Sequence, residues 1–240
     1  MTSPTTEYIL NVARYVSRLD SFPIFCGYVL MVLLAGQWKK FFKPLNLRPV
    51  LVIYNLTASA ISFYTLYGSA VALINSESTF SRQTSEQLQF TYKVYWFAKT
   101  LELLDTVFMV LRHKQRQISF LHVYHHSSML LLSDMTYHSY PYVAISLYLG
   151  LNSAVHVLLY LYYGLSALHP ENPPQWKEFL TQFQITQFVI DLVHATIGYM
   201  FYNYCIYGVF YCIAMIILFS NFYIKAYSKQ SSPSNKRKGI

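Results

Sequence analysis

Long apolar runs dominate the chain, and short polar segments separate them. Seven runs can be read, at residues 22–38, 50–74, 94–111, 118–133, 142–163, 179–200 and 205–223. Most of them reach the roughly 20 residues that a helix needs to cross a bilayer. Those at 22–38 and 118–133 are shorter, and the second carries three histidines. The pattern predicts an all-α integral membrane protein with seven transmembrane helices.

Polar residues gather at the two ends and in one internal segment. Residues 1–21 are mixed in character and predict an amino-terminal tail, whereas 228–240 form a basic carboxyl-terminal tail. The longest polar interruption, 76–90, is interpreted as an ordinary loop. The remainder, 22–227, is expected to be a single membrane domain, because no internal repeat or linker divides it.

Composition supports this class: 54% of the 240 residues are hydrophobic and only 12% are charged, far from the averages of soluble proteins. Short cytoplasmic loops carry an excess of Lys and Arg. Thirteen of the 18 basic residues fall in four alternate segments, at 39–48, 112–116, 177 and 225–238. The amino terminus is therefore expected outside the cytosol, on the luminal side, and the carboxyl terminus inside. Membrane topology accounts for the net charge of +8, so no nucleic-acid partner is expected.

Ionisable residues lie inside two of the apolar runs. Lys99, Glu102 and Asp105 are spaced three apart, so a helix would place them on one face. The following run contains His122, His125 and His126, at i, i+3 and i+4. Such groups are costly in lipid and indicate a functional site.

Later runs add further polar residues. Asn152 and His156 are four residues apart, on one helix face. At 1.5 Å per residue, several groups lie at one level, on the order of 10 Å below the cytosolic face. This level contains Asp105, His125, His156, Gln184 and Gln187. A lone amide in a membrane helix is more often an interhelical hydrogen bonder, but the convergence with histidines favours a catalytic centre.

A neutral histidine can act as a base, a metal ligand or a nucleophile. The cysteines, Cys26, Cys205 and Cys212, form no CxxC pair and lie away from the polar set. No glycine-rich phosphate loop and no serine nucleophile elbow is present. A buried imidazole is thus the strongest nucleophile candidate.

Four motifs, K-T-L-E-L-L-D-T, H-V-Y-H-H, N-S-A-V-H-V-L-L-Y-L-Y-Y and T-Q-F-Q-I-T-Q-F, resemble in order and spacing those of the very-long-chain fatty acid elongase (ELO) family. The resemblance covers about residues 48–227. It implies an enzyme of the endoplasmic reticulum membrane, a very-long-chain 3-oxoacyl-CoA synthase. This enzyme would condense a long-chain acyl-CoA, polyunsaturated chains included, with malonyl-CoA, as the first step of fatty acid elongation. It also implies six helices around a substrate tunnel closed at the luminal side.

Two details qualify the match. Leu159 stands where the family usually has Met, a change that conserves volume. The tail ends in R-K-G-I, which resembles a dilysine retrieval signal, although Arg237 replaces one lysine.

Roles follow as expectations. His125 is the expected nucleophile, although His126 and His156 are not separated from it by the sequence alone. His122, His126 and His156 would transfer protons. A supporting set would orient these groups or stabilise charge: Lys99, Glu102, Asp105, Asn152, Gln184 and Gln187. The CoA phosphates would meet basic residues: Arg112, Lys114, Arg116 and Lys177. No cofactor and no metal is expected.

Two alternatives remain open. One is a membrane di-iron desaturase or hydroxylase, since its histidine clusters include H-x-x-H-H. The other is a seven-helix transporter or receptor. For an elongase, the expected partners are acyl-CoA, malonyl-CoA, membrane lipid, and the reductase, dehydratase and enoyl reductase that complete the cycle. A second copy of the chain is a further candidate partner.

Overall fold

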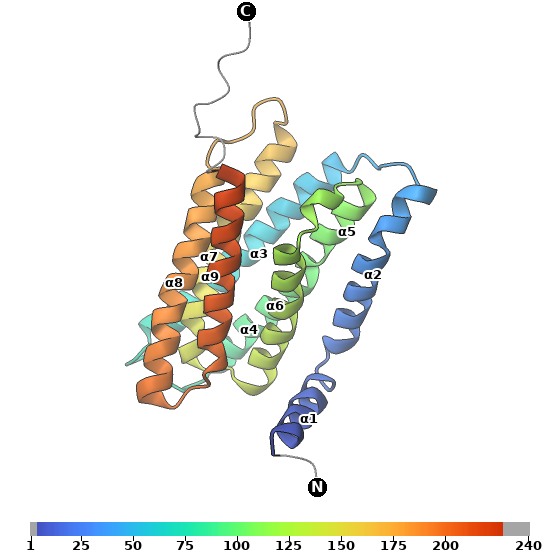
Figure 1. Cartoon of the computed structure of the whole chain (residues 1–240). Coiled ribbons are helices and arrows are strands. Elements are labelled where there is room, and N and C mark those ends of the chain that lie inside the picture. The colour runs from blue at the N-terminus through green and yellow to red at the C-terminus, as the bar shows by residue number, and fades with distance from the viewer. Residues whose placement is uncertain (1–3, 228–240) are drawn as a thin grey trace, which may run out of the picture.

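The computed structural model describes residues 4–227, which form helices joined by short connections (Figure 1). The helices are α1 (Pro4–Val16), α2 (Phe22–Phe41), α3 (Arg48–Ile74), α4 (Glu86–Glu102), α5 (Leu104–Leu111), α6 (Phe120–Ser139), α7 (Val143–Leu168), α8 (Lys177–Tyr202) and α9 (Tyr207–Tyr227), with a 3-10 turn, η1 (Gln115–Gln117), before α6. The prediction of an all-helical protein is confirmed for these residues. The predicted tail 228–240, with its retrieval signal, lies outside them.

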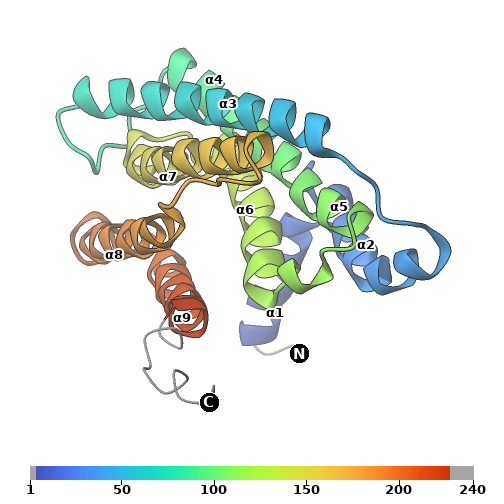
Figure 2. The same cartoon turned by 90° about the horizontal axis from the view of Figure 1, so that it is seen from above.

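Six helices pack in a ring. Helix α3 packs against α7, α7 against α8, and α8 against α9; α9 then meets α6, α6 meets α4, and α4 returns to α3. Seen from above, these helices follow one another around the molecule (Figure 2). Helix α2 lies outside this ring, against α5 and α6. The inward faces of six helices therefore share one centre.

Four of the described helices are long and apolar enough by themselves to cross a membrane: α2, α3, α7 and α9. The other predicted spans correspond to α4 with α5, to α6 and to α8. These helices carry buried polar or ionisable residues, such as Lys99, Asp134 and Asp191, which lower their hydropathy. Four candidate membrane spans thus agree with the prediction, and the full count of seven stays a prediction.

The predicted span at 94–111 is corrected in two ways. Its helix begins earlier, at Glu86, because the Ser85 side chain accepts a hydrogen bond from the Leu88 N–H at 3.1 Å, as an N-cap does. Residues 86–90, predicted as loop, are therefore the first turns of α4. The helix is also interrupted at Leu103, where the N–H bonds the Thr100 carbonyl in a tighter turn, and α5 continues the chain.

The segment 1–21, predicted as an amino-terminal tail of mixed character, contains α1. Its apolar and polar residues alternate with a helical period.

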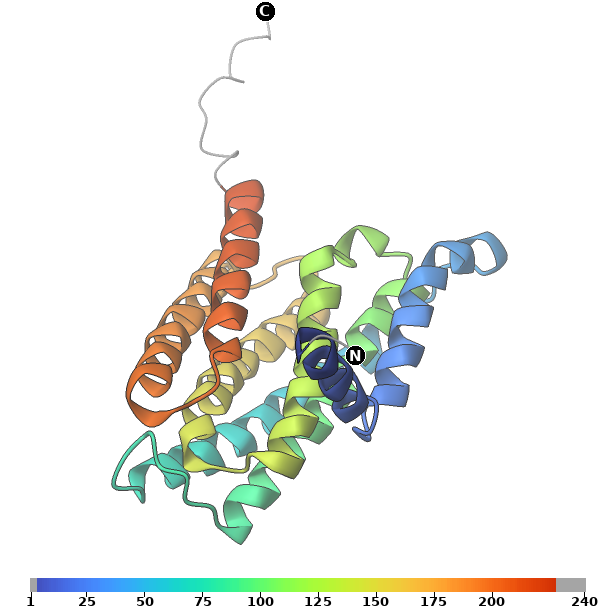
Figure 3. The same cartoon turned by 60° about the horizontal axis from the view of Figure 1, so that its bottom comes forward.

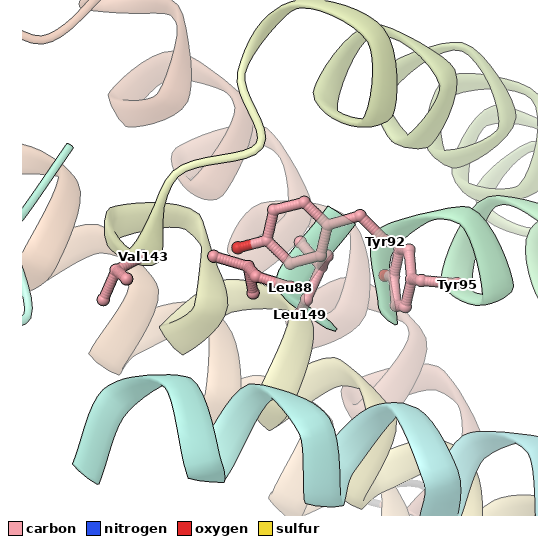
Figure 4. Packing of buried hydrophobic residues seen from close by; sticks show 5 residues of the cluster. All are labelled: Leu88, Tyr92, Tyr95, Val143 and Leu149. Atoms are coloured by element: carbon pink, nitrogen blue, oxygen red, sulfur yellow. The ribbon is translucent and has the colours of Figure 1, made fainter. Parts of the chain in front are cut away.

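A buried cluster locks α4 to α7 next to the polar centre. It contains Leu88, Tyr92, Tyr95, Val143 and Leu149 (Figure 4). The Tyr92 hydroxyl donates to the Tyr142 carbonyl at 2.8 Å and lies 2.9 Å from the Ser146 hydroxyl. Since Tyr95 and Tyr92 are one and two turns from Lys99, this packing fixes the register of α4 on α7.

The end of the ring at which α9 begins is covered by the connection between α3 and α4, residues 75–85 (Figure 3). Figure 3 shows this connection beside the one between α8 and α9. Arg82 donates to the carbonyls of Tyr202 and Asn203, and the Tyr204 hydroxyl donates to the Phe80 carbonyl. Phe80 stacks on both His194 and Tyr202, each at 4.4 Å between ring centroids. These contacts tie the connection to α8.

Candidate active site

A buried ion pair lies on the inward face of α4. Lys99 and Glu102 are 2% and 3% exposed, and the Lys99 Nζ lies 2.7 Å from Glu102 Oε1. The three-residue spacing on a helix brings the two side chains together. A charged pair so deeply buried needs further hydrogen-bond partners to offset its desolvation.

His156, on α7, supplies such a partner. Its Nδ1 is 3.0 Å from Glu102 Oε1 and 3.3 Å from the Lys99 Nζ. An ammonium only donates and a carboxylate only accepts, so Lys99 and His156 both donate to Glu102. The proton of a neutral His156 is thereby assigned to Nδ1, and its Nε2 keeps a free lone pair.

The same two helix faces form a ladder of three polar contacts. The pairs are Tyr95 with Asn152, Glu102 with His156, and Asp105 with Tyr160. The Tyr95 hydroxyl donates to Asn152 Oδ1 at 2.7 Å, and the Tyr160 hydroxyl donates to Asp105 Oδ2 at 2.8 Å. The four-residue spacing on α7 explains the ladder, because i and i+4 share a face. The structure thus brings together four residues singled out in the sequence, Glu102, Asp105, Asn152 and His156, and places Lys99 beside them.

Helix α6 brings its histidines to the centre of the ring. Its N-cap is Ser119, whose hydroxyl accepts from the His122 N–H at 3.2 Å. His125 and His126 are each 9% exposed. The ring of His125 lies 6.2 Å from that of His156 and 5.4 Å from that of His126. Because α6 and α7 are not consecutive in the ring of helices, the imidazoles of His125 and His156 approach each other across its interior.

The histidines differ in their hydrogen bonds. His122 Nε2 lies 2.8 Å from the Thr106 hydroxyl on α5. Within residues 4–227, the ring nitrogens of His125 and His126 have no hydrogen-bond partner. An imidazole with unbonded nitrogens in a buried polar centre is available for chemistry.

The side-chain amides of Gln184 and Gln187, on α8, do not bond any of the described histidines. Gln187 is buried, and its Nε2 donates to Asp191 Oδ2 at 3.2 Å, one turn along its own helix. Gln184 is half-buried and has no side-chain hydrogen bond within the described part of the chain. Neither amide is bonded to a histidine in this structure.

The basic residues expected to meet CoA lie near helix ends on the side of the ring at which α9 ends (Figure 1). Lys114, Arg116 and Lys177 are exposed and Arg112 is half-buried. None of them forms an ion pair among the described residues. Their charges are therefore available to an anionic ligand.

Sequence reasoning missed four contributors to this centre: Tyr28, Tyr95, Thr106 and Tyr160. Thr106 and Tyr160 were inside the quoted motifs, and the four-residue spacing from His156 to Tyr160 was a usable signal. Tyr28 had no such signal in the sequence, because its contact with Thr106 depends on how α2 packs on the ring. Among the described residues no group of three or more His, Cys, Asp or Glu is arranged to hold a metal ion.

Buried imidazoles, a buried ion pair and oriented amide and hydroxyl groups lie inside a ring of apolar helices, an arrangement typical of the polar site of a membrane-embedded enzyme. Comparison with known proteins gives the family. The model of the ELO family, described as GNS1/SUR4, matches residues 17–235. The chain belongs to this family of multi-pass membrane proteins of fatty acid elongation, which confirms the resemblance found in the motifs.

Relatives agree with the family assignment. The chain is 34% identical over 227 residues to very long chain fatty acid elongase 5 of Xenopus tropicalis, covering 87% of this chain and 75% of that protein. It is 33% and 32% identical over 222 residues to the proteins of the same name from Rattus norvegicus and Homo sapiens, covering 87% of this chain and 74% of each relative.

Proposed function

We propose that the protein is a very-long-chain 3-oxoacyl-CoA synthase of the endoplasmic reticulum. It joins a long-chain acyl-CoA, polyunsaturated chains included, to malonyl-CoA, and releases CO2, CoA and a 3-oxoacyl-CoA two carbons longer. The observation that carries this proposal is the His125 imidazole, whose unbonded nitrogens lie between the other histidines in a chain of the elongase family.

In the first half-reaction a His125 nitrogen attacks the thioester carbonyl. The C–S bond breaks, CoA leaves as its thiolate, and the acyl group stays on His125 as an acyl-imidazole. The ring proton that His125 loses passes to His156 Nε2 or His126, and from there to the thiolate. Dividing the reaction in this way predicts ping-pong kinetics.

His156 is suited to the proton transfer, because Glu102 accepts from its Nδ1 at 3.0 Å and leaves Nε2 as a base. The carboxylate also stabilises the imidazolium that forms when Nε2 takes up a proton. Lys99 balances the charge of Glu102 and keeps it ionised in an apolar setting. Asp105, held by Tyr160, supports the same face.

In the second half-reaction malonyl-CoA loses CO2, and the electron pair of the broken C–C bond forms an enolate. Its carbon attacks the acyl carbonyl and the C–N bond to His125 breaks. The leaving ring nitrogen takes up a proton supplied from solvent through His126 or His156, which is the one proton that the overall condensation consumes, and the neutral imidazole is regenerated. Asn152 is oriented for this step: since Oδ1 accepts from Tyr95, its Nδ2 group can donate to a developing oxyanion. Gln184 and Gln187 are further donors on the expected substrate path.

The expected topology agrees with this route. Seven spans, with α4 and α5 acting as one, would put the basic residues of the α5–α6 and α7–α8 connections in the cytosol, and the amino terminus in the lumen. Arg112, Lys114, Arg116 and Lys177 would meet the CoA phosphates, while the acyl chain enters a tunnel inside the ring that is closed at the luminal side. The reductase, dehydratase and enoyl reductase of the cycle would then take up the product, and the chain can also act as a homodimer.

The proposal is tested in microsomes with labelled malonyl-CoA and a panel of saturated and polyunsaturated acyl-CoAs. The native chain should incorporate label into a product two carbons longer, and His125→Ala should not. His169→Ala is the matched control, because His169 is exposed on the α7–α8 connection. No incorporation by the folded native chain across the panel would overturn the proposal, and bound iron in that case would favour the desaturase alternative.

The nucleophile is tested separately. Labelled acyl-CoA given without malonyl-CoA should leave one acyl group on the protein, on the peptide that contains His125. A label on His126 or His156 would move the role of nucleophile to that residue while leaving the condensation intact.

A further inference from the structure

Helix α2 reaches the histidines although it lies outside the ring. The side chain of Tyr28 is buried against α5 and α6, with 4% of its surface exposed. Its hydroxyl lies 3.0 Å from the Thr106 hydroxyl, which in turn lies 2.8 Å from His122 Nε2. Thr106 itself is fully buried. A continuous chain of three hydrogen-bonding groups thus joins α2 to the first histidine of H-V-Y-H-H.

The protons of this chain can be counted. In one direction Tyr28 donates to Thr106, Thr106 donates to His122 Nε2, and each hydroxyl proton is used. In the other direction His122 Nε2 donates to Thr106 and Thr106 donates to Tyr28, which leaves the phenolic proton of Tyr28 without an acceptor among the described residues. A buried donor without a partner is costly, so the first direction is favoured.

We propose that Tyr28 and Thr106 are positioning residues that hold His122 in the tautomer with its proton on Nδ1. Because Nε2 accepts from Thr106, Nδ1 carries the ring proton and is the hydrogen-bond donor of His122 beside the other α6 histidines, His125 and His126. The ring of His122 lies 4.3 Å from that of His126, so this donor sits beside the imidazoles of the condensation. The inference rests on the proposed function and adds α2 to the machinery.

Helix α2 is held in register for this purpose. At one end the Ser21 N–H and hydroxyl both donate to the buried Asp134 of α6, at 2.6 and 2.5 Å. At the other end the Gln115 amide donates to the Ala35 carbonyl at 3.0 Å. Between them Tyr28 packs with Leu103 and Leu130. A helix fixed at both ends cannot slide by a turn, so Tyr28 stays opposite Thr106.

Three variants test the hydrogen-bond chain from Tyr28 through Thr106 to His122, which we call the relay: Tyr28→Phe, Thr106→Val and Thr106→Ser. Tyr28→Phe should lower kcat about threefold to tenfold with little change in KM, because Thr106 loses the donor that orients it. Thr106→Val should lower kcat further, about tenfold to a hundredfold, since His122 loses its partner. Thr106→Ser keeps the hydroxyl and should restore most of the activity. Equal losses in Thr106→Ser and Thr106→Val would overturn the relay.

Two measurements separate a relay from a packing effect. In nitrogen-15 spectra of histidine-labelled protein, the His122 signals, assigned by their loss in His122→Gln, should show the proton on Nδ1 in the native chain. Thr106→Val should change that pattern. Native signals with the proton on Nε2 would overturn the proposal. In addition, Tyr28→Phe should have little further effect in a His122→Gln background, whereas a full, additive loss there would point to packing alone.

Ser21→Ala is the control for docking of α2. It removes the Ser21 hydroxyl contact to Asp134 and should lower Tm, yet kcat per folded molecule should stay near native because the relay is intact. A kcat loss in Ser21→Ala as large as in Tyr28→Phe would assign the effect to helix docking. The outcomes also separate the two proposals: if the native chain condenses substrates while Tyr28→Phe and Thr106→Val are unimpaired, only this inference fails. If the native chain shows no condensation, the proposed function fails while the spectra still report the tautomer.

Discussion

His125 and His194 are both buried inside the ring of helices, yet their surroundings are opposite. His194 uses both ring nitrogens: Nδ1 lies 3.0 Å from the Tyr148 hydroxyl and Nε2 lies 3.2 Å from the Thr79 carbonyl. Because a carbonyl only accepts, Nε2 carries the proton and Nδ1 accepts from Tyr148. His125, by contrast, has no hydrogen-bond partner for either nitrogen within the described residues.

The difference teaches what burial alone does not. A buried polar group whose donors and acceptors are all hydrogen-bonded stabilises one arrangement of helices. His194, with the stacked Phe80, holds the α3–α4 connection in place in this way. A buried polar group whose donors or acceptors have no hydrogen-bond partner lowers stability, and such groups are found at functional sites. The two histidines therefore predict opposite results on mutation, one on turnover and the other on stability.

The largest expected effect is on turnover. His125→Ala should abolish condensation, a loss of at least about 10²- to 10⁴-fold in kcat, because it removes the attacking group. The fold should persist, since no hydrogen bond is lost. Steady-state incorporation of labelled malonyl-CoA and a melting curve in detergent measure the two properties. A strongly lowered Tm with kcat per folded molecule near native would reverse the comparison.

Next in size is the ion pair beside His156. Glu102→Gln removes the carboxylate that Lys99 and His156 share, and leaves a buried ammonium without a counter-charge. Such a change costs about 3–5 kcal/mol of stability. The double variant Lys99→Met with Glu102→Gln should recover part of the stability, because the unpaired charge is gone, but none of the turnover. Additive destabilisation in this cycle would mean that the two side chains do not act as a pair.

The positions of the helices and the residues of the centre were largely predictable from the sequence. Hydropathy located the apolar runs, and three- and four-residue spacings identified Lys99, Glu102 and His156. The sequence could not show the interruption at Leu103, because a tight turn between two apolar helices has no compositional signal. It also could not show that Tyr28 joins the histidines, since that contact depends on how α2 packs on the ring.

The hydrogen-bonding state of each residue was equally hidden. His125 and His194 look alike in the sequence, as histidines within apolar runs. The loop carbonyl of Thr79 accepts a hydrogen bond from His194, and no spacing in the sequence predicts a contact with a carbonyl 115 residues away. Tertiary contacts of this kind separate structural from chemical histidines.

A moderate effect is expected at the structural histidine. His194→Ala removes two hydrogen bonds and one ring stack, and should cost about 1–3 kcal/mol of stability. The turnover of the molecules that remain folded should change little. Phe80→Leu should cost less, because it removes only the stacking. Thermal unfolding in detergent, with turnover normalised to folded protein, gives both numbers. Loss of turnover without loss of stability would give His194 a chemical role.

The smallest effect is expected at Gln187, which has a predicted chemical role, as His125 does, and a satisfied hydrogen bond, as His194 does. Gln187 lies at the sequence depth of the histidines, but its Nε2 donates to Asp191 at 3.2 Å. A side-chain hydrogen bond between membrane helices contributes about 0.6 to 2 kcal/mol of stability, and this contact within α8 should contribute no more. Gln187→Ala should lower kcat only a few-fold, because Gln187 is one of several possible donors to the substrate. Gln184→Ala, half-buried and without a side-chain hydrogen bond in the described part of the chain, is the matched comparison. If Gln187→Ala instead reduced kcat as much as His125→Ala, the amide would have to turn from Asp191 to the substrate during the reaction.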